Sequence, residues 1–167
     1  MIEINKENFE EICHKLNDME FSDAEDKKVC EWFIDKIYNF SDEAYSFEDE
    51  GYNWDEVNIR YFGCCYSFND EKKPIMDIID VSFEEKNEMV YITYAFKSSF
   101  TEATINNQIR IPMDWFFDHD NYLKMWKTEI VKKHIKNIEN KIADHSRQIN
   151  QLQIELIMEK NKISLAN

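Results

Sequence analysis

Two runs of apolar residues near the start of the chain follow the three- and four-residue spacing of an amphipathic helix. The first run predicts a helix over residues 6–19 and comprises Phe9, Ile12, Cys13, Leu16 and Met19. Ser22 and Glu25 stand three residues apart, as in a capping box that satisfies the free amides at a helix start. The second run therefore predicts a helix that follows Ser22 and ends near residue 40, and it comprises Val29, Trp32, Phe33, Ile37 and Phe40.

From residue 57 to residue 111 the period of the apolar residues shortens to two, which is typical of strands with one buried face. Val57, Ile59 and Tyr61, for example, alternate with polar residues. Four strands are predicted, over residues 57–68, 75–83, 89–96 and 104–111. Because short polar turns link them, we expect neighbouring strands to pair antiparallel.

The last 48 residues of the chain, from position 120, contain neither Gly nor Pro, and their apolar residues repeat every seven positions. This repeat predicts one long helix with an apolar seam, the pattern of a coiled coil. Such a helix would extend roughly 70 Å and could not bury its seam on a small domain. We therefore expect a homo-oligomer through this seam, which consists of Val131, Ile135, Ile138, Ile142, Ile149, Leu152, Leu156 and Ile163.

The number of helices in such an assembly stays open. His145 and Glu159 interrupt the seam, whereas Ile154, Ile157 and Met158 widen the apolar surface near its end. A homodimer, a larger bundle and a hairpin that reverses near residues 144–146 are all compatible with this pattern.

Together these patterns predict an α+β fold with two N-terminal helices, an antiparallel sheet of about four strands and a long C-terminal coiled-coil helix. Two parts are expected: an acidic α+β body over residues 1–118 and the long helix over residues 119–167. A length of 167 residues, with 43% hydrophobic and 14% aromatic residues, supplies material for one self-sufficient core.

Charge is divided unevenly between these parts. Residues 1–120 carry 29 acidic against 11 basic residues, a net charge of −18, while residues 121–167 carry 5 acidic against 9 basic residues, a net charge of +4. Such a negative body repels nucleic acid and anionic membranes and attracts basic protein surfaces. We therefore predict a basic protein surface as partner, with no direct nucleic-acid binding and no membrane association.

The sequence also bears on the cellular compartment. No secretory signal and no run of 18 apolar residues occurs. Cys13, Cys30, Cys64 and Cys65 show no CxxC spacing, so buried, reduced thiols are expected. These features predict a cytoplasmic protein, and the richness in Lys, Asn and Ile suits an AT-rich genome such as that of a low-GC bacterium or its phages.

No catalytic, metal or cofactor motif is predicted. The four His residues lack partners at ligand spacing, and the carboxylates do not form a calcium loop. Cys64 and Cys65 have mainly aromatic neighbours, which do not activate a thiol. Asp118, His119 and Asp120 are expected to cap the long helix. We therefore expect a protein that is not an enzyme and has no cofactor.

The most distinctive local feature is a run of acidic and aromatic residues, which we call the acidic segment (residues 42–56). One interpretation is a solvated loop, because charge runs usually face water. The other is a partner-binding surface in which aromatic anchors are surrounded by carboxylates that imitate a path of phosphates. Its candidate residues are Asp42, Glu43, Tyr45, Phe47, Glu48, Asp49, Glu50, Tyr52, Trp54, Asp55 and Glu56.

Two classes of function follow. The first is a non-enzymatic inhibitor that occupies the basic nucleic-acid-binding groove of a target protein, such as a nuclease. In charge, size and lack of chemistry the chain is similar to phage-encoded DNA mimics and anti-CRISPR proteins, which implies the cytoplasm of a bacterial host. The alternative is a structural or adaptor protein assembled through its C-terminal coiled coil.

Overall fold

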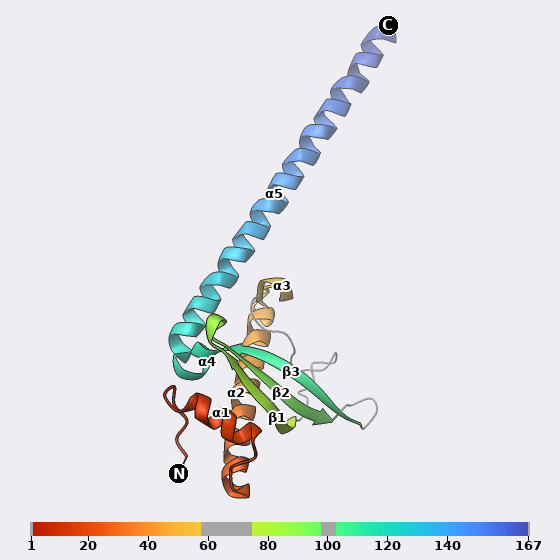
Figure 1. Ribbon diagram of the computed structural model, residues 1–167. Helices are drawn as coiled ribbons and strands as arrows, with labels where there is room; N and C mark the ends of the chain where they lie inside the picture. The colour runs from red at the N-terminus through yellow and green to blue at the C-terminus, as the bar shows by residue number, and fades with distance from the viewer. Residues whose placement is uncertain (1, 58–74, 98–102, 167) are drawn as a thin grey trace. The chain divides into compact units, whose positions relative to one another are not determined.

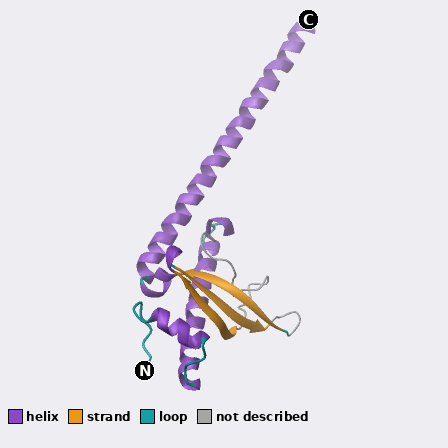
Figure 2. Cartoon of the chain, viewed as in Figure 1, coloured by secondary structure: helices purple, strands orange, loops and turns teal. Residues whose placement is uncertain are grey.

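The computed structural model describes residues 2–57, 75–97 and 103–166 (Figure 1). Helices and a small antiparallel sheet make up an α+β fold, which confirms the predicted fold class (Figure 2). In chain order the elements are α1 (Phe9–Asn17), α2 (Asp23–Asp49), α3 (Trp54–Val57), β1 (Ile75–Glu84), the 3₁₀ turn η1 (Glu85–Asn87), β2 (Met89–Lys97), β3 (Thr104–Pro112), α4 (Met113–Phe117) and α5 (His119–Ala166).

The chain divides into two compact units. The N-terminal unit is Met1–Trp126 and the C-terminal unit is Lys127–Asn167. Helix α5 is continuous across the division, so that its first two turns belong to the N-terminal unit. The sequence analysis predicted an earlier boundary, with the acidic body ending at residue 118.

The first two helices begin and end for local reasons. The carboxylate of Glu25 accepts hydrogen bonds from the amide of Ser22 (3.2 Å) and from its hydroxyl (2.7 Å), which confirms the capping box. Both hydrogen bonds lower the pKa of Glu25, and the bond from the hydroxyl has the larger effect. Helix α1 ends at Asn17, and Met19 has a φ of 55° and is 86% exposed. The prediction that Met19 shares the buried face of this helix was therefore wrong.

Helix α2 is longer than predicted. It runs to Asp49 and is followed by Gly51, whose φ of 99° lies in the left-handed region that Gly favours. Phe40, Ala44 and Phe47 are all buried and continue the helical spacing past residue 40. The predicted end near residue 40 was wrong because the acidic residues that follow lie at half-buried and exposed positions of the same helix, around its buried residues.

The sheet has three described strands in the order β1-β2-β3, all antiparallel. They correspond to the predicted strands over residues 75–83, 89–96 and 104–111. The prediction over residues 57–68 lies outside the described residues except for Val57, which ends helix α3 and does not begin a strand. A fourth strand is therefore not part of the described sheet.

One face of the sheet belongs to the core. Along β2 the alternate residues Val90, Ile92 and Tyr94 are fully buried, and Ile92 lies between Val81 of β1 and Ile109 of β3. Helices α1 and α2 both contact β1. The amide of Asn17 pairs with the backbone of Val81 through two hydrogen bonds, of 2.7 and 2.9 Å, and so occupies part of the β1 edge.

Two aromatic clusters join the helices of the N-terminal unit. The first connects α1, α2 and α4 through contacts among Phe9, Trp32, Phe33, Phe116 and Phe117. The second connects α2, α4 and the start of α5 through Phe40, Phe47, Trp115, Tyr122 and Trp126. Rings of this size supply most of the area that such a small core can bury.

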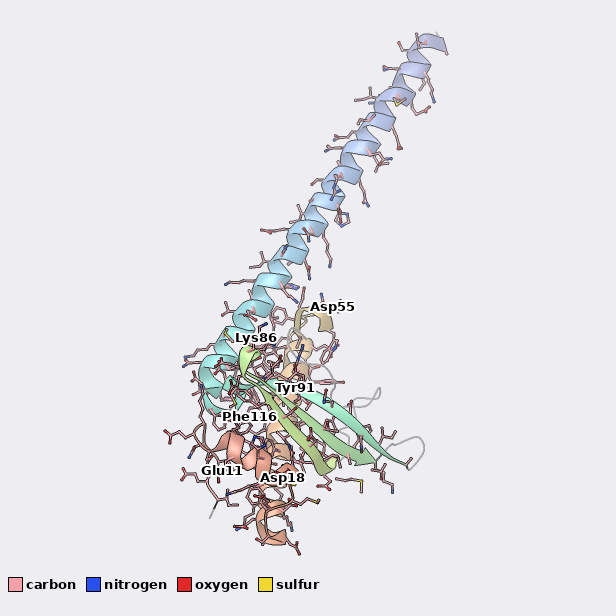
Figure 3. All side chains as sticks on the ribbon, in the orientation of Figure 1. Glu11, Asp18, Asp55, Lys86, Tyr91 and Phe116 are labelled. Carbon is pink, nitrogen blue, oxygen red and sulfur yellow. The ribbon has the colours of Figure 1, made fainter. Side chains whose placement is uncertain are left out.

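The C-terminal unit consists of the rest of α5, and the side chains that surround it are drawn in Figure 3. Every described residue from Ile138 to Ala166 is exposed. The predicted seam therefore lies on one uninterrupted helix, which contradicts the hairpin near residues 144–146.

Candidate partner-binding site

The acidic segment occupies the end of α2, the turn that follows it and helix α3. Residues 42–49 belong to α2, Glu50 caps that helix, and residues 54–57 form α3. The segment is therefore largely helical and not a loop, but its exposed acids and the buried Phe47 also fit the first interpretation, in which the acids face water. Asp55 lies on α3 and is labelled in Figure 3.

Its acidic residues differ in exposure. Glu48, Asp49, Glu50 and Asp55 are exposed, and Asp42 and Glu43 on α2 are half-buried. Four carboxylates thus face solvent at the C-terminal end of α2 and on the short helix α3. This is the part of the segment that a basic partner could contact first.

Phe47 and Glu56 were predicted as partner-binding residues but are each only 1% exposed. The ring of Phe47 packs edge-on against Trp126, with centroids 5.1 Å apart. The carboxylate of Glu56 accepts a hydrogen bond from the amide of Asn53 (3.0 Å), while the Asn53 side chain accepts one from the amide of Glu56 (3.1 Å). Both residues serve the local fold, so a binding surface on this segment has to be built without them.

The remaining aromatic residues are partly accessible. Tyr45, Tyr52 and Trp54 are all half-buried. The rings of Tyr45 and Trp54 lie with centroids 6.0 Å apart at an angle of 58°, a tilted contact between α2 and α3. This contact ties α3 to α2 and leaves part of each ring at the surface beside the carboxylates.

The charge of the α2 C-terminus opposes the helix dipole. The negative end of a helix favours basic residues, by about 0.3–1 kcal/mol each at the surface. The last turn of α2 contains no basic residue, and Glu48, Asp49 and Glu50 stand there instead. The local structure is therefore less stable than the same helix with basic residues would be.

A cleft of about 330 Å³ lies beside the segment and shares two of its residues, Asp42 and Glu43. The rest of its lining is Lys36, Asn39, Trp115 and His119. The ammonium group of Lys36 lies 5.5 Å from the centre of the Trp32 ring, a cation–π contact. The lining of the cleft thus combines the two acidic residues Asp42 and Glu43 with one basic residue, Lys36.

The cleft was missed in the sequence because its residues come from α2, α4 and α5, which are far apart in the chain. Asp42 and Glu43 carry the only sequence signal, as members of an acidic run. Nothing in the pattern around Trp115 or His119 indicates that they share a surface hollow with α2.

The predicted seam is the second candidate site. Val131 is half-buried, and the other seven seam residues are between 43% and 66% exposed. Ile154, Ile157 and Met158, which widen the apolar surface, are exposed to a similar degree. Large aliphatic side chains are thus presented to solvent from Ile135 to Ile163, which is unusual for a helix without a partner.

The described thiols are not reactive sites. Cys13 and Cys30 are buried. Burial, followed by nearby carboxylates, raises the pKa of Cys13 to about 12 and that of Cys30 to about 11. Cys64 and Cys65 lie outside the described residues. Within residues 2–57, 75–97 and 103–166, no group of three His, Cys, Asp or Glu side chains could hold a metal ion.

Comparison with protein-family models, with curated proteins and with solved structures finds no match for this chain. Among the helices of the described residues, none combines the length and the apolar character needed to cross a membrane. The function has to be argued from the two surfaces themselves.

Proposed function

We propose that the chain is a non-enzymatic binding protein that uses the acidic segment to occupy the basic nucleic-acid-binding groove of a target protein, such as a nuclease. The observation that supports this most is the position of Glu48, Asp49 and Glu50 at the negative end of α2. Proteins break a local stability rule of this kind mainly at functional sites, which is why these three carboxylates support a binding role.

The surface in this proposal is smaller than the whole segment. It consists of the exposed carboxylates Glu48, Asp49, Glu50 and Asp55, with Tyr45, Tyr52 and Trp54 as partly accessible anchors. The neighbouring cleft, with Asp42 and Glu43, receives a Lys or Arg side chain of the target. Carboxylates at helix ends then stand where the phosphates of a nucleic acid would contact the target's groove.

The test uses a charge reversal in the segment and a matched reversal outside it. Glu48→Lys with Asp49→Lys is compared with Glu7→Lys and Glu20→Lys, which change the net charge equally at two other exposed positions. Each protein serves as bait in the lysate of a low-GC bacterium, and captured nucleases are purified. Their affinity for each bait is then measured with and without competing duplex DNA.

The proposal expects capture of a nuclease by the wild type and by the outside variant, and release of that nuclease by DNA. The segment variant should bind it at least about tenfold more weakly, a loss of about 1.4 kcal/mol. Equal binding by all three baits, or binding that DNA does not compete with, would contradict the proposal.

A second candidate function is that of a structural or adaptor protein assembled through α5. The observation in its favour is the seam, whose aliphatic side chains are exposed along the C-terminal unit. Assembly would bring several acidic N-terminal units to one basic partner without any competition with nucleic acid. Light scattering on the purified chain tests it, and a monomeric mass at micromolar concentration would rule it out.

A further inference from the structure

We propose that two copies of this chain pair through α5 in antiparallel orientation, centred beside Arg147, so that their N-terminal units attach at opposite ends of a two-stranded rod. This inference rests on the second candidate function, because it names the partner of the seam and the direction in which that partner runs. The partner is a second copy of the same helix.

The size of the seam fits a dimer. Pairing would cover the exposed parts of eight aliphatic side chains on each chain, on the order of 1,500 Å² in total, which is within the range of stable interfaces.

The antiparallel register centred beside Arg147 brings six of the eight seam residues against one another, and the other two, Ile135 and Ile149, face Glu159 and His145. In an antiparallel pair, a residue at the first position of the seven-residue repeat faces a residue at the fourth position on the other helix. This places Val131 opposite Ile163, and Ile142 opposite Leu152. By the same symmetry Ile138 faces Leu156.

Glu159, which interrupts the seam, favours the same direction. In a parallel pair in register, Glu159 would face Glu159 of the second copy. Two carboxylates placed directly opposite one another repel each other and so destabilise the pair of helices. In the antiparallel register Glu159 faces Ile135 and His145 faces Ile149, so that no two like charges meet in the seam.

The charge of the N-terminal units adds a long-range argument. Residues 1–120 carry a net charge of −18. A parallel pair would start two such units from helices only about 10 Å apart, whereas an antiparallel pair attaches them about 60 Å apart, at about 1.5 Å for each residue of the C-terminal unit. The larger separation exceeds several screening lengths of about 10 Å at 0.1 M salt.

A charge contact beside the seam distinguishes the antiparallel pair from the parallel pair. In the antiparallel register Lys141 lies beside Glu155 of the second copy, and the contact occurs twice by symmetry. In a parallel pair Lys141 would lie beside Ser146, and Glu155 beside Lys160. All of these side chains are exposed in the single chain.

The first experiment measures the dimer dissociation constant of charge variants by analytical ultracentrifugation. Lys141→Glu should raise the constant about three- to tenfold, because it sets two carboxylates beside each other at two places. Lys141→Glu with Glu155→Lys should restore the wild-type value. Lys136→Glu, an exposed change of the same charge away from the seam, is the control. Equal constants for Lys141→Glu and Lys136→Glu would overturn the antiparallel register.

The second experiment uses disulfide formation at the ends of the seam. Val131→Cys and Ile163→Cys chains are oxidised alone and as a mixture, with the wild-type chain as the control for native thiols. We expect a disulfide between chains in the mixture and none in either chain alone. A disulfide within Val131→Cys dimers alone would show a parallel pair and overturn the proposal while leaving the assembly intact.

Light scattering separates this proposal from the function on which it rests. A mass of two chains is expected. A mass of one chain would overturn both the pairing and the adaptor function. A mass of four chains, in which Ile154, Ile157 and Met158 would also be covered, would overturn the two-stranded pairing and retain the adaptor function.

Discussion

The N-terminal and C-terminal units contain the same kinds of aliphatic residue, but the first unit buries most of them and the second exposes most of them. In the N-terminal unit Ile37, Ile92 and Ile109 are fully buried, whereas in the C-terminal unit Ile142 is 60% exposed and Leu152 is 63% exposed. The difference lies in the number of layers. Helices and a sheet can cover one another within one chain, but a single helix has no second layer to cover its seam. The N-terminal unit therefore completes its own core, and the C-terminal unit leaves its seam exposed to solvent.

The largest effect should come from the core of the N-terminal unit. Trp126 is 3% exposed, stacks on Phe40 with centroids 4.9 Å apart and donates a hydrogen bond to the carbonyl of Val57 (3.0 Å). Trp126→Ala should lower the free energy of unfolding by about 3–5 kcal/mol, measured by chemical denaturation. Trp126→Phe, which keeps a ring and loses the hydrogen bond, should lower it by less. A loss no larger than that of Leu152→Ala would show that the first turns of α5 do not belong to this core.

A charge in the seam should have the next largest effect, and on assembly alone. Ile142→Asp should weaken association by more than about 2 kcal/mol, because pairing would bury an unpaired carboxylate. The near-ultraviolet circular dichroism of the N-terminal unit should not change. Asn140→Asp, which adds the same charge on the same helix away from the seam, should leave the mass of the assembly unaltered. If Ile142→Asp and Asn140→Asp give assemblies of the same mass, the seam of the C-terminal unit is not the surface through which the chains associate.

The thiol of Cys13 gives the N-terminal unit a dependence on pH, and the C-terminal unit contains no Cys. The pKa of a free thiol is about 8.5, and burial raises that of Cys13 to about 12. Its contribution to stability is therefore fully present below pH 8.5 and is lost as the pH rises toward 12. Relative to Cys13→Val, the wild type should lose about 2 kcal/mol between pH 7 and pH 10. Parallel denaturation curves for the two proteins across this range would contradict the burial of the thiol.

The smallest effect should be a gain in stability at the end of α2. Glu48→Lys should stabilise the N-terminal unit by about 0.3–1 kcal/mol, because it replaces an acid with a base at the negative end of a helix. The expected shift in the thermal midpoint is a few degrees upward. Under the proposed function the same variant binds its target less well, so that stability and binding change in opposite directions. A destabilised variant would show that Glu48 has a structural role in the fold.

Several features of the fold were predictable because they depend on local patterns. The capping box at Ser22, the alternation in the described strands and the seven-residue repeat of α5 each follow from a period that the backbone itself imposes. The length of α2 was not predicted, because an acidic run reads as a loop unless the buried Ala44 and Phe47 within it are recognised as continuing the helix.

The candidate site was predictable only in part. The exposure of Glu48, Asp49 and Glu50 fits the expected behaviour of charged residues. Glu56 shows why the rest was not predictable: it belongs to the same acidic run, but its carboxylate caps α3 and is 1% exposed. Composition assigns both kinds of residue to one surface, and only their neighbours in space separate them.

By itself the sequence determined α1, the start of α2, the three described strands, the long helix α5 and the division of charge, since these depend on residues that are neighbours in the chain. The short helices α3 and α4 were not predicted. The tertiary structure decided which members of each pattern are accessible. Phe47 lies against Trp126, although 79 residues separate them, and the cleft beside Asp42 is lined in part by Trp115 from another helix. Burial is a property of packing between distant segments, so no local pattern can specify it.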